Sequence, residues 1–350
     1  MKSEVASGSP LFPDPVLTAS LYCDGRLDEI FRNVLAPFRQ ELGVYDAEGA
    51  CYLWTVRYAR RGEHLKIRLH GPEERRPLLQ SLLEDIAGNY FAALGPPEQG
   101  APRQVSEKSP PIDTEDSGEG LFPDRTLLWT GYKRSHVSLA GEPFLLDDHY
   151  VALFTRCAAA GCNQVIQVLQ LDSSGIIPPS VRPSTLLKMV IDALSSLQAE
   201  KRAMYLAYHR DWLIRFTLLK RHTDPEQAQK VLTHLDHRLQ SMAAKVEATR
   251  RTQEERWEGN GEPADANWRR SFAALSRYAE AVCQNPDYHI DPFARDPRFA
   301  FFFKVLHGLA NQLGLSMMDE AFVHHLLLRA AEGMAEPDTP ACQIDWESAR

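Results

Sequence analysis

Hydrophobic and polar residues alternate most regularly in EHLKIRLH, residues 63–70. Leucine and isoleucine occupy one side of an extended chain in this stretch. The other side carries four basic or titratable side chains: His64, Lys66, Arg68 and His70. This period of two predicts a β-strand with one face on an apolar core. The polar side is either an ordinary solvated sheet surface or a cleft floor that binds an anionic or carbonyl-rich ligand.

The same pattern predicts the remaining elements. Strands are expected at residues 14–23, 50–58, 63–70 and 125–132, and the short ARRGE between the second and third strands predicts a hairpin. Helical spacing occupies residues 25–42, 73–94 and 146–161, and nearly everything from 182 onward apart from a polar break at 258–266. This order predicts an α+β fold: an antiparallel sheet with a helical layer, followed by a helix-rich C-terminal half.

Composition narrows the functional classes. The chain has 350 residues, enough for one large domain or two ordinary ones. A net charge of −8 argues against a non-specific nucleic-acid binder. No apolar run reaches the ~20 residues of a membrane span, and the first twenty residues have no apolar core typical of a secretion signal. The six cysteines are scattered, so a cytoplasmic protein with reduced thiols is expected.

Familiar cofactor and metal motifs are missing from the sequence. It contains no G-x-G-x-x-G, no phosphate-binding loop, no HExxH and no G-x-S-x-G. His324 and His325 lie in an apolar helical segment, where core or surface histidines are the better interpretation. No cofactor and no metal site are therefore expected.

Two further segments carry candidate chemistry. GYKRSHVSLAGEPF, residues 131–144, is either a loop that satisfies its own backbone or a set of proton-transfer groups. Its polar side chains are Arg134, Ser135, His136 and Ser138. In FKVLHGLANQLG, His307 and Asn311 are four residues apart and share a helix face. His307 is either a hydrogen-bonded core histidine or a functional one.

Several of these segments together resemble a known family. LWTVRYARRGEHLKIRLHGP, the opening DPVLTASLYC and the closing VLHGLANQLGLSMMDEAFVHHLLLRA are similar to the glutamate-eliminating C-terminal domain of class I lantibiotic dehydratases. His307 and Asn311 match the family's His-x-x-x-Asn-Arg-Leu block, whereas Gln312 stands where the family has arginine. The resemblance implies a single elimination-like domain over residues 1–350. Within it, 95–120 is expected to be a flexible loop or insertion, and 223–298 a variable helical region.

With an RSHVSL segment and no glutamylating domain, the chain looks most like the stand-alone thiopeptide pyridine synthases. That resemblance implies a formal aza-[4+2] cycloaddition between two dehydroalanines of a linear azole-bearing peptide. Water and the leader peptide, as its carboxamide, are then lost to give a pyridine-centred macrocycle. The implied partners are a precursor peptide (leader plus dehydrated azole-containing core) and the other enzymes of the same pathway.

The resemblance also suggests roles for individual residues. The expected catalytic residues are Ser135, His136, His307 and Arg68. The expected substrate-binding residues are Arg57, Tyr58, His64, Lys66, Trp129, Arg134, Ser138, Tyr205, Asn311 and Gln312. The basic side chains of residues 201–222 are either a groove for an acidic leader or ordinary solvated helix charges.

Two departures from the family keep other functions open. Lys66 replaces an arginine, which matters where a planar fork binds two oxygens. YKRSHVSLAGE replaces a Glu-x-x-Arg-Tyr-Gly-Gly-type segment. One alternative is a stand-alone lyase that eliminates glutamate from glutamylated serine. It needs a separate glutamylating partner and favours arginine at position 66. The other is a non-catalytic leader-binding module.

Overall fold

Two compact units make up the chain, residues 1–177 and residues 178–350. The computed structural model describes residues 16–45, 50–59, 62–95, 122–130, 148–171, 180–219, 225–258, 265–284, 296 and 298–332.

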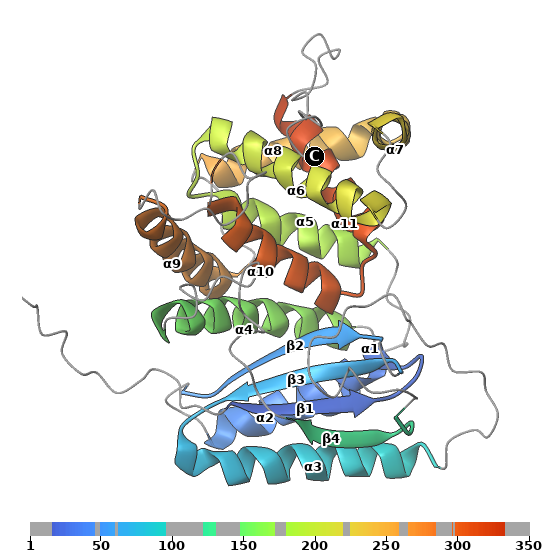
Figure 1. Cartoon of the computed structure of the whole chain (residues 1–350), viewed down its shortest axis with the longest axis vertical. Coiled ribbons are helices and arrows are strands. Elements are labelled where there is room, and N and C mark those ends of the chain that lie inside the picture. The colour runs from blue at the N-terminus through green and yellow to red at the C-terminus, as the bar shows by residue number, and fades with distance from the viewer. Residues whose placement is uncertain are drawn as a thin grey trace, which may run out of the picture. The chain divides into compact units, whose positions relative to one another are not determined.

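The described strands of the first unit form one antiparallel sheet in the order β2-β3-β1-β4 (Figure 1). Their bounds are β1 Leu17–Tyr22, β2 Tyr52–Tyr58, β3 His64–His70 and β4 Thr126–Thr130. β2 and β3 pair from Tyr58 opposite His64 to Tyr52 opposite His70, which is the predicted hairpin. All of the strands expected from the alternation are therefore confirmed.

Helices cover the apolar face of this sheet. They are α1 Leu27–Ile30, the π-helical segment η1 Phe31–Leu35, α2 Ala36–Tyr45, the 3₁₀ turn η2 Glu73–Arg75, α3 Arg76–Ala93 and α4 Asp148–Gln170. Leu65 and Ile67 of β3 are fully buried on this face. On the same face α4 contacts β2, with Thr55 Oγ1 3.9 Å from Cys162 Sγ. The predicted apolar side of β3 therefore packs against the core.

The described part of the second unit is helical. Its helices are α5 Val181–Leu194, α6 Ala199–Leu219, α7 Pro225–Gln240, α8 Ala243–Trp257, α9 Ala266–Val282, α10 Arg298–Gln312 and α11 Met317–Glu332. α11 is buried on nearly every side from Glu320 to Leu328, polar side chains included, and it contacts α5, α6, α7 and α8. It is therefore a central helix of this unit.

A short turn brings the start of α11 back against the end of α10. Gly314 has φ +70°, a left-handed conformation that favours glycine after a helix end. Ser316 then caps α11 by accepting from the backbone N–H of Asp319 at 3.1 Å. This turn places the first residues of α11 beside the side chains of α10, which is what assembles the site described below.

The predicted α+β class is confirmed, with an antiparallel sheet and a helix-rich C-terminal half. Most of the expected 95–120 loop lies outside the described residues. The expected variable region 223–298 includes α7, α8 and α9. Within the described ranges, no helix combines the length and apolarity needed to cross a membrane.

Candidate active-site residues

The polar side of β3 is buried. His64, Lys66, Arg68 and His70 each expose 1% or less of their surface. Residues paired across antiparallel strands point to the same side of the sheet, so aromatic rings and hydroxyl groups share this face. The contributors are Thr18, Ser20 and Tyr22 from β1 and Tyr52, Trp54, Val56 and Tyr58 from β2. The interpretation of this side as an ordinary solvated surface is therefore wrong, and its use in binding stays a prediction.

Each buried cation of β3 lies over an aromatic ring of β2. Lys66 Nζ is 4.9 Å from the centre of the Tyr58 ring, and the Arg68 guanidinium carbon is 4.7 Å from that of Trp54. Trp54 Nε1 also donates to His70 Nε2 at 3.1 Å. Burial and the nearby Arg68 charge lower the pKa of His70 to about 3, which keeps this ring neutral. Each ring stabilises the cation that lies over it.

Arg57 and Trp129 point to the other side of the sheet. Arg57 donates to Asp28 of α1 at 2.5 Å, and Trp129 Nε1 donates to Glu84 of α3 at 2.6 Å. Strand pleating turns alternate residues to opposite faces, so Tyr58 joins the polar side of β3 while its neighbour Arg57 does not. Arg57 and Trp129, both expected to bind substrate, therefore do not share the polar side of β3, and a role in binding for either stays a prediction.

His307 of α10 forms a hydrogen-bonded pair with Glu320 of α11. His307 Nδ1 lies 2.8 Å from Glu320 Oε2, and the His307 side chain remains 32% exposed while that of Glu320 is 1% exposed. Within the described residues, no partner holds His307 Nε2. A buried carboxylate thus orients the ring through one nitrogen and leaves the other open. This is the arrangement of a histidine that transfers protons.

A second histidine binds the other oxygen of the same carboxylate. His209 Nε2 of α6 lies 2.7 Å from Glu320 Oε1, and the Tyr205 hydroxyl lies 2.7 Å from His209 Nδ1. His209 and Tyr205 are both fully buried. Tyr205, expected to bind substrate, is therefore connected to His307 through two intervening side chains.

The carboxylate of Glu320 affects the protonation states of both histidines that it binds. Burial raises the pKa of Glu320, but the two histidines outweigh burial and hold it well below its usual value. Burial lowers the pKa of His307, but the charge and hydrogen bond of Glu320 outweigh burial and raise it. For His209, the effect of burial is larger than the opposing effect of Glu320, so the pKa of His209 is lowered. The favoured state is an ionised Glu320, a neutral His209 and a readily protonated His307.

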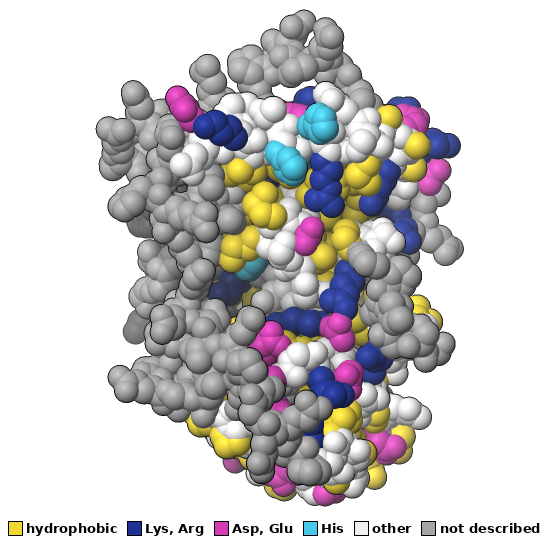
Figure 2. All heavy atoms as spheres, turned by 90° about the vertical axis from the view of Figure 1, so that its right-hand side faces the viewer, with side chains coloured by type: hydrophobic (Ala, Val, Ile, Leu, Met, Phe, Trp, Pro, Cys, Tyr) yellow, Lys and Arg dark blue, Asp and Glu magenta, His cyan; other side chains and the backbone are white. Residues whose placement is uncertain are grey.

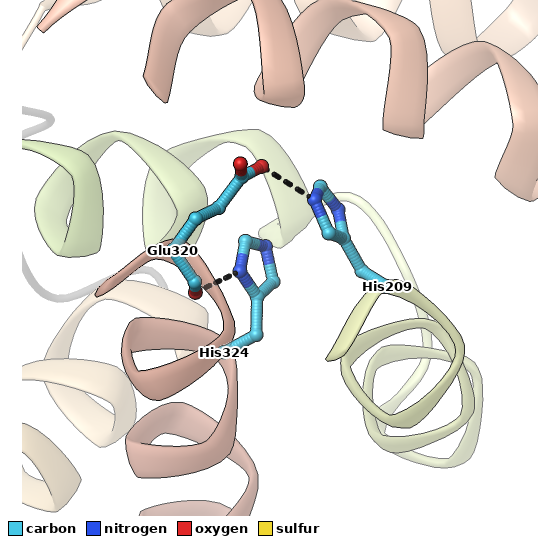
Figure 3. A group of neighbouring side chains, drawn as sticks. All are labelled: His209, Glu320 and His324. Atoms are coloured by element: carbon cyan, nitrogen blue, oxygen red, sulfur yellow. Dashed lines mark hydrogen bonds and ion pairs between the residues drawn. The ribbon is translucent and has the colours of Figure 1, made fainter. Parts of the chain in front are cut away.

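Three atoms suited to metal binding lie close together here. His209, Glu320 and His324 each offer one ligand atom, all within 4.8 Å of one another (Figure 3). The rings of His209 and His324 stack at 3.8 Å with planes 19° apart, so their in-plane lone pairs run side by side and do not converge on one ion. His209 and Glu320 also use these atoms in hydrogen bonds. The geometry favours a hydrogen-bond network over a metal centre.

Other expected site residues are placed as follows. Asn311 lies one turn after His307 on α10, and Gln312, next along the helix, is buried. Arg134, Ser135, His136 and Ser138 lie outside the described residues. Neither Glu320 nor His209 was expected at the site from the sequence.

Basic side chains of α6 do not form a separate cationic stripe. Lys201 lies 3.3 Å from Asp296, and Arg210 is buried and donates to Asp211 at 2.7 Å. Arg202 lies over the ring of Trp257, 4.4 Å from its centre. Figure 2 likewise shows charges of both signs interspersed with hydrophobic side chains over the described part of one face. Among the described residues, α6 therefore provides little free positive charge for an acidic leader.

Comparison with known proteins identifies the family. The model of the lantibiotic biosynthesis dehydratase C-terminal family matches residues 17–331. A search of curated proteins found no match. The fold is similar to that of the pyridine synthase TbtD from thiomuracin biosynthesis, with a TM-score of 0.57, 18% identity, and coverage of 90% of this chain and 97% of that one.

A second similar structure is TsrL, with a TM-score of 0.54, 14% identity, and coverage of 90% of this chain and 93% of that one. The tRNA-dependent lantibiotic dehydratase MibB from Microbispora sp. 107891 matches with a TM-score of 0.47 and 17% identity, over 95% of this chain and 28% of that one. The family match extends over most of the chain and includes both the β2–β3 hairpin and the His307–Glu320 pair. This chain belongs to the lantibiotic biosynthesis dehydratase C-terminal family.

Proposed function

We propose that this chain is a pyridine synthase of thiopeptide biosynthesis. The observation that carries the proposal is the fold similarity to the pyridine synthase TbtD, which extends over 97% of that enzyme. Family membership supports it, since it places the chain among biosynthetic enzymes that modify peptides. The proposed substrate is a precursor peptide with its leader and two dehydroalanines in an azole-containing core.

The proposed reaction consists of ring closure followed by two eliminations. A backbone amide reacts as its imidic-acid tautomer, completing a 2-azadiene that adds to the second dehydroalanine and forms a hydroxypiperidine. Loss of water and of the leader as its carboxamide then yields the aromatic ring. Binding both dehydroalanines in reactive geometry supplies part of the acceleration. The remaining chemistry is proton transfer, which requires no redox cofactor.

His307 is suited to these proton transfers. Its raised pKa makes the imidazolium available near neutral pH, and its open Nε2 is the atom that can deliver a proton to a departing hydroxyl or amide nitrogen. Glu320 stabilises the charged ring and holds it in position through Nδ1. We assign His307 as the catalytic acid and base of the eliminations, with Glu320 as its positioning carboxylate.

The polar side of β3 is suited to binding peptide carbonyl groups. Arg68 has a planar fork of donors, and Lys66 adds a compact ammonium group. Both are buried beside aromatic rings, an environment that strengthens a charge-assisted hydrogen bond. We assign these two residues to substrate binding, with Ser135 and His136 as predicted proton-transfer groups.

Glutamate elimination from a glutamylated serine is the second candidate. The family to which the chain belongs favours it, and the His307–Glu320 pair would serve that proton transfer equally well. The lysine at position 66, in place of the family's arginine, is the feature that argues against it.

Two peptides separate these functions by mass spectrometry. The purified protein is incubated in parallel with a leader-bearing azole peptide containing two dehydroalanines and with a matched glutamylated-serine peptide. A macrocyclic product from the first peptide alone supports the synthase. Loss of glutamate from the second peptide alone overturns it in favour of the lyase. Leader binding without conversion of either peptide also overturns it and indicates a binding module. The His307→Gln variant is the matched control for catalysis.

A further inference from the structure

Four side chains form a continuous hydrogen-bonded row from the interior of the C-terminal unit to the exposed ring of His307. The order is Tyr205, His209, Glu320, His307, and the three contacts measure 2.7, 2.7 and 2.8 Å. An ionised carboxylate only accepts hydrogen bonds. His209 must therefore donate from Nε2, and His307 must donate from Nδ1.

The same constraint determines the tautomer of His209. A neutral His209 that donates from Nε2 has a bare Nδ1, and this atom accepts from the Tyr205 hydroxyl. The ring is fully buried and stacks on His324, which donates from its own Nδ1 to the Glu320 backbone carbonyl at 2.9 Å. A proton added to Nδ1 of His209 would reverse the direction of the Tyr205 hydrogen bond and place a charge in the interior. The proton taken up by this row therefore resides on His307.

Glu320 has a flexible side chain, and His307 alone would leave one of its oxygens without a donor in a buried site. His209 supplies that donor from a different helix. With both oxygens bound, the carboxylate is held in one orientation. That orientation keeps the proton of a neutral His307 on Nδ1 and leaves Nε2 free to act as a base.

We propose that His209, fixed by Tyr205, is a positioning residue that maintains His307 as the Nδ1–H tautomer by orienting Glu320. This inference rests on the proposed function, in which Nε2 of His307 exchanges protons with the substrate. Neither His209 nor Tyr205 contacts the substrate in this account. They act on the reaction only through the carboxylate.

Nitrogen NMR of ¹⁵N-histidine-labelled protein tests the proposal without any substrate. The signals of His307 are assigned from the His307→Gln variant, and its tautomer ratio is measured above its pKa in wild type, His209→Leu, His209→Gln and Tyr205→Phe. Leucine removes the donor to Glu320, whereas the glutamine amide retains one. His325→Leu is the matched control, because His325 of α11 is buried like His209 of α6 but binds Asp236 and Arg210 in place of Glu320.

The proposal predicts that His307 is mostly the Nδ1–H tautomer in wild type, in His209→Gln and in His325→Leu. In His209→Leu it should shift toward the Nε2–H tautomer by several-fold, with Tyr205→Phe intermediate. Turnover of the dehydrated peptide should fall about ten- to a hundredfold in His209→Leu, in kcat and not in KM, because only the orientation of the catalytic ring is lost. Near-UV circular dichroism identifies any variant that has not folded.

A His209→Leu protein that folds and keeps the wild-type tautomer ratio overturns the proposal. So does an equal shift in His325→Leu, because that result would mean that loss of any buried histidine disturbs α11. The outcome is independent of the proposed reaction: a tautomer shift in a protein that never converts the dehydrated peptide sustains the positioning role and overturns only the synthase assignment.

Discussion

His307 Nδ1 lies 2.8 Å from Glu320 Oε2, although the two residues are thirteen positions apart and on different helices. The turn at Gly314 makes the contact possible by reversing the chain between α10 and α11. One member of the pair is partly exposed and the other is buried. The pair therefore joins a group that can meet a substrate to a fixed interior charge, and the first predictions concern this link.

Replacing Glu320 with glutamine should shift the pH dependence of turnover toward lower pH. The charge of Glu320 raises the pKa of His307 above its ordinary 6.5, so proton donation by His307 persists at higher pH in wild type. Glutamine preserves the shape and removes the charge. In a kcat–pH profile, the fall of kcat on the basic side should therefore occur above pH 6.5 in wild type. In the variant, it should occur at a lower pH than in wild type. Glu332→Gln, an exposed change at the end of the same helix, is the control. Identical limbs in both variants would contradict the role of Glu320.

The same pair should make stability depend on pH in both directions. The pKa of Glu320 is lowered on folding, so its contribution is lost as pH falls below the ordinary carboxyl value of 4.5. The pKa of His307 is raised, so its contribution is complete below the ordinary 6.5 and is lost as pH rises through the folded value. The difference in unfolding free energy between wild type and Glu320→Gln should peak between these two values in urea titrations. A difference that does not vary with pH would argue against an ion pair.

Arg68→Met should weaken peptide binding more than it weakens the fold. Methionine retains much of the buried volume beside Trp54, and replacing a buried charge by an apolar group of similar size is often tolerated. Loss of a charge-assisted hydrogen bond of about 1.5–3 kcal/mol predicts a Kd for the peptide raised roughly ten- to a hundredfold. Calorimetric titration measures it, with Arg68→Lys expected to be intermediate. An unchanged Kd would remove Arg68 from the binding site.

Arg57→Met, in contrast to Arg68→Met, should weaken the fold slightly and leave peptide binding unchanged. Its guanidinium binds Asp28 on the apolar side of the sheet, with 14% and 31% of the two side chains exposed. Loss of this partly screened pair should lower the unfolding free energy by about 1 kcal/mol or less and leave the Kd of the peptide unchanged. Urea unfolding and the same titration check both parts. A raised Kd at undiminished stability would restore Arg57 to the substrate site.

His136→Ala tests the proton-transfer role assigned to the RSHVSL segment, which lies outside the described residues. A general acid or base contributes about a hundredfold or more, so kcat should fall at least that far with KM little changed. Single-turnover assays by mass spectrometry measure the loss. Turnover at the wild-type rate would leave the proton transfers to His307.

The local pattern of apolar and polar residues was sufficient to predict which side of a strand each residue occupies. The alternation in β3 placed Lys66 and Arg68 on one side correctly, because a strand has a period of two whatever its neighbours are. The same period, applied to β2, separates Arg57 from Tyr58. The burial of the β3 cations was not predictable, since a polar stripe has the same sequence whether water or protein covers it.

The hydrogen-bonded row from Tyr205 to His307 could not be predicted from the sequence, for a different reason. His307 was found because it has the spacing of a family motif. Glu320 follows a helix cap, and an acid in the first turn of a helix is explained by the helix dipole alone. His209 is on a helix distant in sequence, and only the packing of α6 on α11 joins it to Glu320. Such contacts depend on tertiary structure, which periodicity does not encode.

The accurate mass of the released leader fragment distinguishes a pyridine synthase from a glutamate lyase. Purified wild-type protein is incubated with the leader-bearing peptide that contains two dehydroalanines, and both products are measured. We expect a macrocycle and, in equal amount, a leader that ends in a carboxamide. The leader keeps the nitrogen of the dehydroalanine to which the azadiene adds, whereas the nitrogen of the azadiene stays in the aromatic ring. A leader still attached to an unchanged linear peptide, under conditions where the glutamylated-serine peptide loses glutamate, would contradict it.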